Sequence, residues 1–255
     1  MAESLIGYMP KHKAYLEPFA GSLAVFFRKQ KSTWNAVNDV DKDIANLYYV
    51  CSRIDLFEQF KEKSLYMIQS KEIYDIVRES IKKSKNKIRI PDVQRAVDYF
   101  FFISTSFNNR PGTSLSKIVT KWNTDLVENL KNTRKKLDNV IIENLDVNNF
   151  IDKYQNTKNA FWFFDPPYYV ANNTEYYGRV FNQYQHRIFK EKIDMISGKC
   201  KFLITYDDSE EIRHLFKEYY IKEVPVKYRS THEIMDTNEI LITNYPLHER
   251  QQNLF

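Results

Sequence analysis

Residues 161–169, FWFFDPPYY, decide the fold, because an uninterrupted apolar run there stops at an aspartate followed by two prolines. A short, wholly apolar run that ends at a turn signal is typical of a strand buried on both faces, as in a parallel sheet. In an open parallel sheet, ligands bind just beyond the carboxyl ends of the strands. The tetrapeptide Asp165-Pro166-Pro167-Tyr168 would lie there, which makes it the first candidate site.

The chemistry of this tetrapeptide favours a ligand that carries an amino group. Two prolines fix the backbone and remove two N–H donors, so the turn presents carbonyl oxygens and one carboxylate, all of them acceptors. Tyr168 adds a flat face on which a planar base could stack, an interaction that contributes about 1–3 kcal/mol per base in single-strand binders. The alternative, a rigid turn with no ligand, stays open at this point.

The flanking segments predict an α/β fold. Residues 14–27 read as a short buried strand, a turn through Pro18 and Gly21, and a helix that begins near Ser22. A second apolar run at 34–37 is followed by apolar residues at helical spacing. This order of strands and helices implies parallel strands with helices on both faces of the sheet.

A composition change separates two predicted domains. The segment 53–136 shows no convincing strand and is rich in Lys, Arg and Asn, so it reads as a mainly helical, basic insertion. Beyond it we expect strands at 139–142, 160–164, 201–205 and 239–243 and helices near 182–196 and 209–218. We therefore expect one domain made of residues 1–52 and 137–255, carrying the insertion 53–136.

Acidic residues follow three further predicted strands. Glu17-Pro18-Phe19-Ala20-Gly21 closes the first strand, where Gly21 lets a ligand approach the backbone and Glu17 favours a cationic or amine-bearing cofactor. Asp39 ends the second strand, 22 residues after Glu17, as does the acidic residue that holds ribose hydroxyls in dinucleotide folds. Asp146 follows the strand at 139–142. Helix capping is the alternative for Asp39 and for Asp146.

Composition excludes several other classes of protein. Aromatic residues make up 15% of the 255 residues and glycine only five positions, so the chain is neither disordered nor collagenous. The five glycines cannot form GxGxxG or a phosphate-binding GxxxxGK[ST] loop. Two cysteines exclude a disulfide framework, and five scattered histidines show no metal spacing. No apolar run spans a membrane, and we expect a cytoplasmic protein.

Five motifs in fixed order carry a family resemblance: EPFAGS at 17–22, NDVD at 38–41, IIENLD at 141–146, DPPYY at 165–169 and EILITN at 239–244. Together they resemble the Dam-type, alpha-class S-adenosylmethionine-dependent DNA adenine methyltransferases, which modify the 6-amino group of adenine. DPPY alone is less specific, because relatives that act on RNA adenine, cytosine amines or protein glutamine use similar tetrapeptides. The full order covers nearly the whole chain.

The resemblance implies a Rossmann-like methyltransferase sheet with an inserted target-recognition domain. It implies that Glu17, Phe19 and Gly21, within the turn that also holds Pro18 and Ala20, shape the methionine side of the cofactor pocket. Asp39 would bind the ribose hydroxyls and Asp146 the cofactor's adenine amine. The target adenine, flipped out of double-stranded DNA, would lie against Asp165, Pro166, Pro167 and Tyr168, with Asp165 also bordering the cofactor.

The insertion is the candidate for reading DNA. A net charge of +5 permits a polyanionic partner without requiring one. Base-edge and phosphate contacts are expected from Asn108, Asn109 and Arg110 and from a run of basic residues: Lys117, Lys121, Lys131, Arg134, Lys135 and Lys136. Tyr176, Tyr177 and Arg179 lie in a polar, aromatic stretch that resembles the loop closing over the base in this class. Solvated helix faces and ordinary packing are the alternatives.

Two departures from the family pattern leave other functions open. Relatives usually carry a Gly-Gly-Lys loop upstream of EPFxG, whereas this sequence begins MAESL. Val147 stands where relatives often have an aromatic residue. The alternatives are a catalytically weak DNA-binding relative and an RNA adenine methyltransferase. A cognate restriction endonuclease is an expected partner, while the sequence does not define the DNA target or the oligomeric state.

Overall fold

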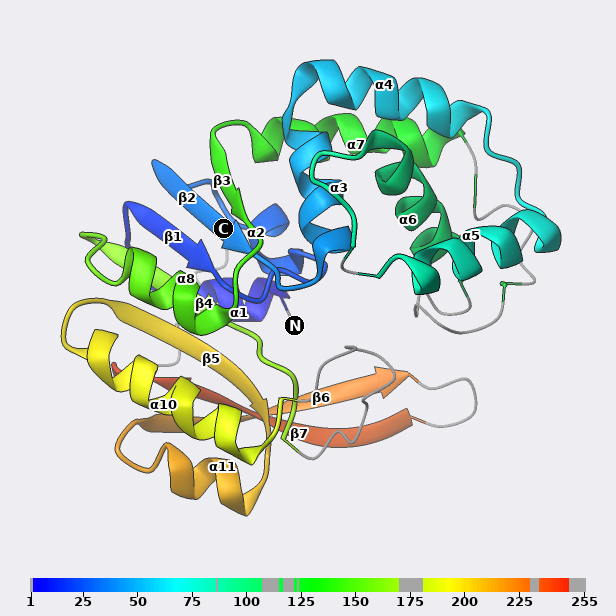
Figure 1. Ribbon diagram of the computed structural model, residues 1–255. Coiled ribbons are helices and arrows are strands. Elements are labelled where there is room, and N and C mark those ends of the chain that lie inside the picture. The colour runs from blue at the N-terminus through cyan, green and yellow to red at the C-terminus, as the bar shows by residue number, and fades with distance from the viewer. Residues whose placement is uncertain are drawn as a thin grey trace, which may run out of the picture. The chain divides into compact units, whose positions relative to one another are not determined.

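The computed structural model divides the chain into two compact units, Met1–Asn38 with Leu145–Phe255, and Asp39–Asn144 (Figure 1). It describes residues 2–85, 87–106, 115–116, 122, 124–169, 181–229 and 234–247.

The first unit contains a mixed β-sheet. Its strands are β1 (Ala14–Glu17), β2 (Trp34–Asn38), β4 (Ala160–Phe164), β5 (Lys201–Asp207), β6 (Tyr220–Arg229) and β7 (Ile234–Thr243). Within this unit they run in the order β2-β1-β4-β5-β7-β6. β2, β1, β4 and β5 are parallel, whereas β7 is antiparallel to both of its neighbours. The expectation of parallel strands therefore holds for the first four of these strands and not for the hairpin β6–β7.

Helices cover both faces of this sheet, as expected for a Rossmann-like fold (Figure 1). The helices of the unit are α1 (Ala2–Tyr8), α2 (Ala24–Arg28), α8 (Val147–Tyr154), α10 (Gln183–Ser197) and α11 (Glu210–Leu215). Side chains alternate between the faces of a strand. Leu16 and Trp162 thus join a core with Phe150 of α8 and Phe189 of α10. On the other face, the ring centroid of Tyr15 lies 6.1 Å from that of Phe26 in α2.

The second unit is mainly helical. It contains α3 (Lys42–Ser52), α4 (Ile54–Leu65), α5 (Lys71–Lys83), α6 (Val93–Thr105), α7 (Thr124–Leu137) and β3 (Val140–Glu143). Its core is aromatic, with Phe100 of α6 packed against Phe60 of α4 and against Trp122. The predicted insertion 53–136 falls inside this unit, which extends further at both ends because α3 packs against α4, α6 and α7, and β3 against α3.

Local backbone conformation accounts for the differences from the predicted helices. The helix expected near Ser22 begins at Ala24, because Leu23 has a positive φ of 52°. The helical run expected after residue 40 is two helices, because Arg53 is extended, with φ −98° and ψ 126°. α1 and β6 were not predicted.

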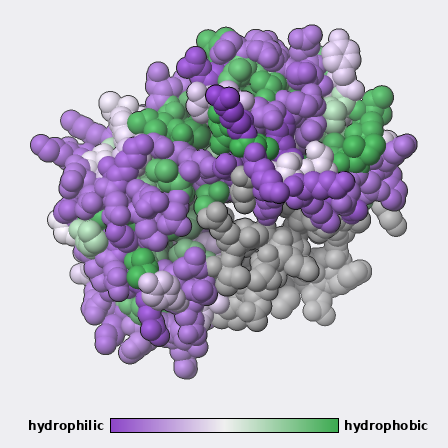
Figure 2. All heavy atoms as spheres, in the orientation of Figure 1, coloured by the Kyte–Doolittle hydropathy of each residue, from purple (hydrophilic) through white to green (hydrophobic). Residues whose placement is uncertain are grey.

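The surface is largely hydrophilic in the view of Figure 2, and apolar side chains gather there only in small patches. Exposed apolar residues of the second unit include Tyr66, Ile68 and Ile76. None of the helices within the described ranges is long and apolar enough to cross a membrane.

Candidate active site

The carboxyl ends of β1 and β4 form the topological switch point of the sheet. β1 pairs with β2 on one side and with β4 on the other, so the chain leaves β1 toward one edge and later returns to its opposite side. Ligands of open α/β sheets bind at such a point. Glu17 is the last residue of β1 and Asp165 directly follows β4. Two of the predicted site residues therefore share this part of the sheet.

Glu17 is a buried carboxyl group, with only 2% of its surface exposed. It accepts a hydrogen bond of 2.7 Å from the Tyr15 hydroxyl. Burial raises the pKa of Glu17 to about 8; the Tyr15 hydrogen bond opposes this shift, the negative charge of Asp165 adds to it, and the charge of Lys29 opposes it. Glu17 is thus mostly protonated at pH 7, and a nearby cation would favour its ionised form.

Lys29 was not singled out from the sequence, although it is 3% exposed and belongs to the surroundings of Glu17. Its ammonium lies 4.2 Å from the centre of the Tyr15 ring. It also donates hydrogen bonds to the Gln30 carbonyl, at 2.7 Å, and to the Ser32 hydroxyl, at 3.0 Å. A buried lysine in a polar sequence such as RKQK leaves no periodic signal, so only the structure reveals it.

The turn after β1 is held by Asn38, the last residue of β2, which is 1% exposed. Its side-chain amide donates to the carbonyls of Pro18, at 2.9 Å, and Leu145, at 3.0 Å, and its amide oxygen accepts from the Leu145 N–H at 2.8 Å. The N–H of Ala20 donates to the Asn38 carbonyl at 2.8 Å. Asn38 thus joins the ends of two strands to the segment that leads into α8.

Gly21 lies in the same turn with a φ of +45°, a left-handed conformation that side chains disfavour. A Cβ atom built at Gly21 would meet no other heavy atom within 4 Å. Steric crowding therefore does not explain this glycine. Its backbone conformation does, and the open space beside it leaves room for a ligand.

The tetrapeptide after β4 and the residue that follows it, Tyr169, are held by three polar side chains of β5 and β7. The Thr205 hydroxyl donates to the Asp165 carboxylate at 2.6 Å. The Tyr168 hydroxyl donates to the Glu239 carboxylate at 2.5 Å. Asp207, which lies opposite Glu239 in the β5–β7 pairing, accepts the N–H of Tyr169 at 2.9 Å. Sequence reasoning assigned no role to these three residues, although Glu239 lies in the EILITN motif.

Asp165 combines solvent access with a protein-lined setting. The residue is exposed, whereas Pro166 beside it is buried and Pro167 and Tyr168 are half-buried. Desolvation raises the pKa of Asp165 to about 6; the Thr205 hydrogen bond opposes the shift and the negative charge of Glu239 adds to it. Solvent reaches Asp165 and partly screens these charges. Asp165 is an accessible acceptor whose basicity is increased.

Aromatic contacts connect the turns after β1 and β4. The Phe19 ring lies 6.0 Å from Phe181, which lies 4.6 Å from the His186 ring, and His186 in turn lies 5.2 Å from Tyr169. His186 shares a hydrogen bond of 2.8 Å with the Tyr206 hydroxyl, and burial lowers its pKa to about 4. His186 is therefore neutral at pH 7, and its contacts are those of a packing residue.

Asp146 and Asp39 both take part in local turns. Asp146 caps α8, because its side chain accepts the N–H of Asn148 at 3.0 Å. Asp39, in the second unit, accepts the N–H of Asp41 at 2.9 Å. Asp41, rather than Asp39, caps α3. The capping alternative thus describes Asp146 but not Asp39, and capping leaves a carboxylate further acceptor capacity for a ligand.

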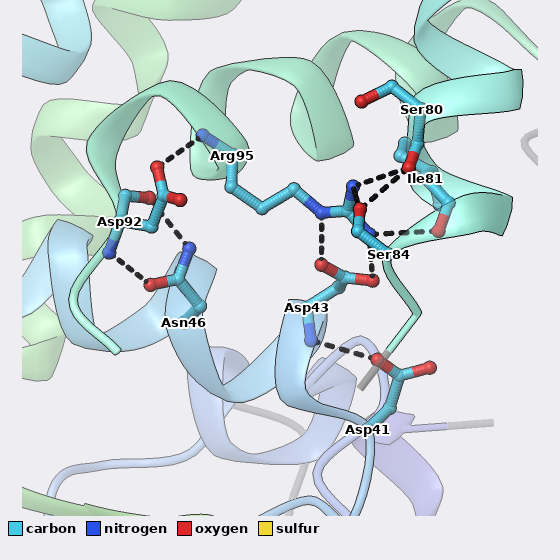
Figure 3. A network of polar contacts seen from close by, with 8 residues as sticks. All are labelled: Asp41, Asp43, Asn46, Ser80, Ile81, Ser84, Asp92 and Arg95. Carbon is cyan, nitrogen blue, oxygen red and sulfur yellow. Dashed lines mark hydrogen bonds and ion pairs between the residues drawn. The ribbon is translucent and has the colours of Figure 1, made fainter. Parts of the chain in front are cut away.

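Next to Asp41, a buried ion pair between Asp43 and Arg95 holds the first turn of α3 (Figure 3). The Asp43 carboxylate accepts from Nε and Nη2 of Arg95, at 2.5 and 2.9 Å, and the two side chains are 2% and 5% exposed. The remaining donors of Arg95 bond to oxygens of α5 and the residue after it: the carbonyls of Ser80 and Ile81 and the hydroxyl of Ser84.

This network reaches Asp39 through backbone amides. The N–H of Asp43 donates to the Asp41 carboxylate at 2.9 Å, and the N–H of Asp41 donates to Asp39. Asn46 adds a second link, because its side chain exchanges hydrogen bonds of 2.8 Å with both backbone groups of Asp92 at the start of α6. The conformation around Asp39 is therefore tied to α5 and α6.

Four of the predicted DNA contacts, Lys131, Arg134, Lys135 and Lys136, lie in α7. The other eight lie outside the described residues: Asn108, Asn109, Arg110, Lys117, Lys121, Tyr176, Tyr177 and Arg179. Among the residues that are described, no three His, Cys, Asp or Glu side chains are grouped so that they could hold a metal ion.

Comparison with solved structures gives distant likenesses. A candidate RNA methyltransferase from Pyrococcus horikoshii matches with a TM-score of 0.41 and 10% identity, over 95% of this chain and 77% of that one. A SAM-dependent methyltransferase from Agrobacterium tumefaciens matches with a TM-score of 0.39 and 8% identity, over 94% of this chain and 58% of that one. No curated protein sequence matches the chain significantly.

A match to a known protein family identifies the family of this chain. Residues 1–230 match the D12 class N6 adenine-specific DNA methyltransferases, a range that includes the turns after β1 and β4 and the whole second unit. This match confirms the resemblance drawn from the five sequence motifs. The chain belongs to the D12 class of N6 adenine-specific DNA methyltransferases.

Proposed function

We propose that the enzyme transfers the methyl group of S-adenosylmethionine to the 6-amino group of an adenine rotated out of double-stranded DNA. The observation that carries this proposal is the turn after β4. There an exposed carboxylate, Asp165, is held by the Thr205 hydroxyl beside two prolines that offer no N–H donor. Such a site suits a ligand that presents N–H groups, as an adenine amine does.

The difficulty of the reaction lies in the amine, whose lone pair is delocalised into the purine ring. If the Asp165 carboxylate and the Pro166 carbonyl accept its two N–H bonds, the nitrogen is drawn toward tetrahedral geometry and its lone pair becomes available. When bound, S-adenosylmethionine supplies the methyl group, and its sulfur retains the electron pair of the broken bond. The amine loses one proton, for which Asp165 is a base of increased pKa.

The residues at the strand ends suit this cofactor. Glu17 is a buried carboxyl group that offers a negative charge once it releases its proton, and S-adenosylmethionine carries a sulfonium and an ammonium group that would favour this ionised form. Gly21 borders open space, so a ligand can approach its backbone. We assign the ribose hydroxyls to Asp39 and the cofactor's adenine amine to Asp146, as the family resemblance implies. Pro18, Phe19 and Ala20 complete the turn.

An adenine within a duplex cannot reach such a pocket, so the base has to leave the stack at a cost of a few kcal/mol. Stacking on Tyr168 would offset about 1–3 kcal/mol of that cost. We assign sequence reading and phosphate contacts to the second unit, through Asn108, Asn109, Arg110, Lys117 and Lys121, and contacts near the base to Tyr176, Tyr177 and Arg179. If phosphate contacts dominate affinity, DNA binding will weaken steeply as salt rises.

Two kinds of experiment test this function. Sequencing genomic DNA for methylated adenine, with and without the protein expressed, identifies the target site. Radiolabelled transfer to a duplex with that site, to its single strand and to matched RNA then compares substrates. We expect transfer to the duplex; transfer to RNA alone would replace this proposal with the RNA alternative. A restriction endonuclease that cuts at the same site would be the expected partner, with both enzymes in the cytoplasm.

Asp165→Ala should abolish transfer while calorimetry still detects S-adenosylmethionine binding. The matched control is Glu210→Ala, which removes an exposed acid in the first turn of α11 and should leave turnover unchanged. Equal turnover by Asp165→Ala and wild type would refute the proposed chemistry. A wild-type protein that binds DNA but not S-adenosylmethionine would instead be the catalytically weak relative.

A further inference from the structure

Glu239 is a buried carboxylate in the candidate active site to which the proposed chemistry gives no role. It lies in β7, is 3% exposed, and accepts the Tyr168 hydroxyl at 2.5 Å. A carboxylate rarely occupies a fully buried position without a charged or hydrogen-bonding partner. Its neighbours along the strand, Ile240, Leu241 and Ile242, are all core residues. An apolar side chain at position 239 would continue that core. The presence of an acidic side chain is therefore best explained by its hydrogen bond to Tyr168.

We propose that Glu239 is a positioning residue for the target base. Through its hydrogen bond to the Tyr168 hydroxyl, Glu239 holds the ring on which the base stacks. This inference rests on the proposed function, in which the target adenine stacks on Tyr168. It extends that function to a residue in β7, 71 positions beyond Tyr168 in the chain.

The geometry fixes Tyr168 at both ends. Its backbone follows two prolines, whose rings restrict φ, and the next residue, Tyr169, is anchored by its N–H to Asp207. Its hydroxyl is anchored to Glu239, which lies directly opposite Asp207 in the β5–β7 pairing. One pair of facing strand residues thus sets both the backbone and the tip of the stacking side chain. A ring held in this way loses little conformational freedom when a base arrives.

Glu239 also has a charge that acts on Asp165. The Thr205 hydroxyl on β5 and the Glu239 carboxylate on β7 act on Asp165. The charge of Asp165 in turn acts on Tyr15 and Glu17 of β1, and the Lys29 ammonium acts on Glu17. The Glu239 charge raises the pKa of Asp165. The hydrogen bond and the charge can be removed separately, because a glutamine at 239 keeps an acceptor oxygen without the charge, and Tyr168→Phe removes the hydrogen bond and keeps the charge.

The test measures methyl transfer to the mapped DNA duplex between pH 5 and pH 9 with saturating S-adenosylmethionine. Tyr168→Phe should lower kcat/KM for DNA by about ten-fold, as expected for loss of one hydrogen bond to a charged group. The pH at which kcat/KM falls on the acidic side of the profile, here called the acidic limb, should not change. Glu239→Gln should retain most of kcat/KM at pH 8 and move the acidic limb to lower pH. Glu223→Gln, which changes an exposed carboxylate of the neighbouring strand β6, should behave as wild type.

A double-mutant cycle separates positioning from folding. If the hydrogen bond carries the effect, Tyr168→Phe combined with Glu239→Ala should be no slower than the slower single variant. The role of Glu239 is overturned if Tyr168→Phe leaves kcat/KM unchanged, if the two effects multiply, or if Glu239→Ala lowers only the melting temperature. The proposed function fails differently, namely when wild type gives no transfer to DNA or when Asp165→Ala matches wild type.

Discussion

The buried ion pair between Arg95 and Asp43 predicts a large and specific loss of stability when Arg95 is replaced by methionine. The substitution leaves a carboxylate that is 2% exposed without the two donors that now lie at 2.5 and 2.9 Å. It also removes donors to Ser80, Ile81 and Ser84. Removing one partner of a buried pair costs about 3–5 kcal/mol, because the other charge stays buried without compensation. A domain is stable by only about 5–15 kcal/mol, so this loss is a large fraction of the total.

Urea denaturation followed by far-UV circular dichroism measures this loss, since the second unit is mainly helical. We expect Arg95→Met to lose about 3–5 kcal/mol of unfolding free energy. Combining Arg95→Met with Asp43→Leu should recover most of this loss, because no unpaired charge remains. The matched control is Lys71→Met, which breaks an exposed pair with Asp75 in the same unit and should cost less than about 0.5 kcal/mol.

The same substitution should also weaken cofactor binding. Asp43 holds Asp41 through its N–H, and Asp41 holds Asp39, to which we assign the ribose hydroxyls. Calorimetry with S-adenosylmethionine, at a temperature where the variant is folded, should therefore show a raised Kd for Arg95→Met. The reasoning is refuted if Arg95→Met unfolds within about 1 kcal/mol of wild type, or if adding Asp43→Leu makes the loss larger.

Three further outcomes follow from the described side chains. Gly21→Ala should cost about 1–2 kcal/mol of stability through its φ of +45° alone, whereas Gly198→Ala, at φ −81°, should be neutral or stabilising; equal melting temperatures would contradict this. Cys51 and Cys200 should react slowly with thiol reagents at pH 8 until urea is added, since burial raises both pKa values to about 12. Because the pKa of Glu17 is raised, its stabilising contribution is complete below pH 4.5 and is lost as pH rises through about 8; Glu17→Gln should therefore gain stability over wild type at pH 8.5 and not at pH 4, and a gain independent of pH would refute this.

The strands of the sheet interior could be predicted because burial leaves a continuous apolar signal. Ala160–Phe164 is buried at every position, and its predicted and observed bounds agree. β6 leaves no such signal, since charges interrupt the apolar residues of YIKEVPVKYR at irregular spacing and Pro225 reads as a break. The hairpin β6–β7 therefore could not be predicted from its own sequence, and it is defined by pairing with a distant strand, β5.

The candidate site also contains residues that the sequence predicts and residues that it does not. Glu17 and Asp165 could be predicted, because the carboxyl ends of parallel strands meet at one edge and both residues stand at such ends. Thr205 and Glu239 could not be assigned roles, because they lie within runs that read as ordinary core strands. The sequence shows only that a charged residue, Glu239, begins the apolar run EILIT. The alternation of side chains along a strand does not decide which face of the sheet this residue occupies. Partners across a sheet depend on register, which a single sequence does not contain.

The electrostatics of the strand ends predict that Glu17 releases a proton when the cofactor binds. The pKa of Glu17 is raised by burial and by the charge of Asp165, and the pKa of the more accessible Asp165 is raised by local desolvation and by the charge of Glu239. A cation bound beside Glu17 would lower its pKa from about 8, so a proton that Glu17 holds at pH 7 would be released on binding.

Calorimetric titration with S-adenosylmethionine in buffers of different ionisation enthalpy measures this release. We expect nearly one proton released at pH 7 and an affinity that rises between pH 6 and about 8 and then levels off. Glu17→Gln should release none, and its affinity should not depend on pH over this range. S-adenosylhomocysteine, which lacks the sulfonium charge, should release fewer protons from wild type. If both ligands release the same number, the ammonium group that both carry, and not the sulfonium, changes the ionisation of Glu17. If neither ligand releases a proton, the cofactor's methionine side lies elsewhere.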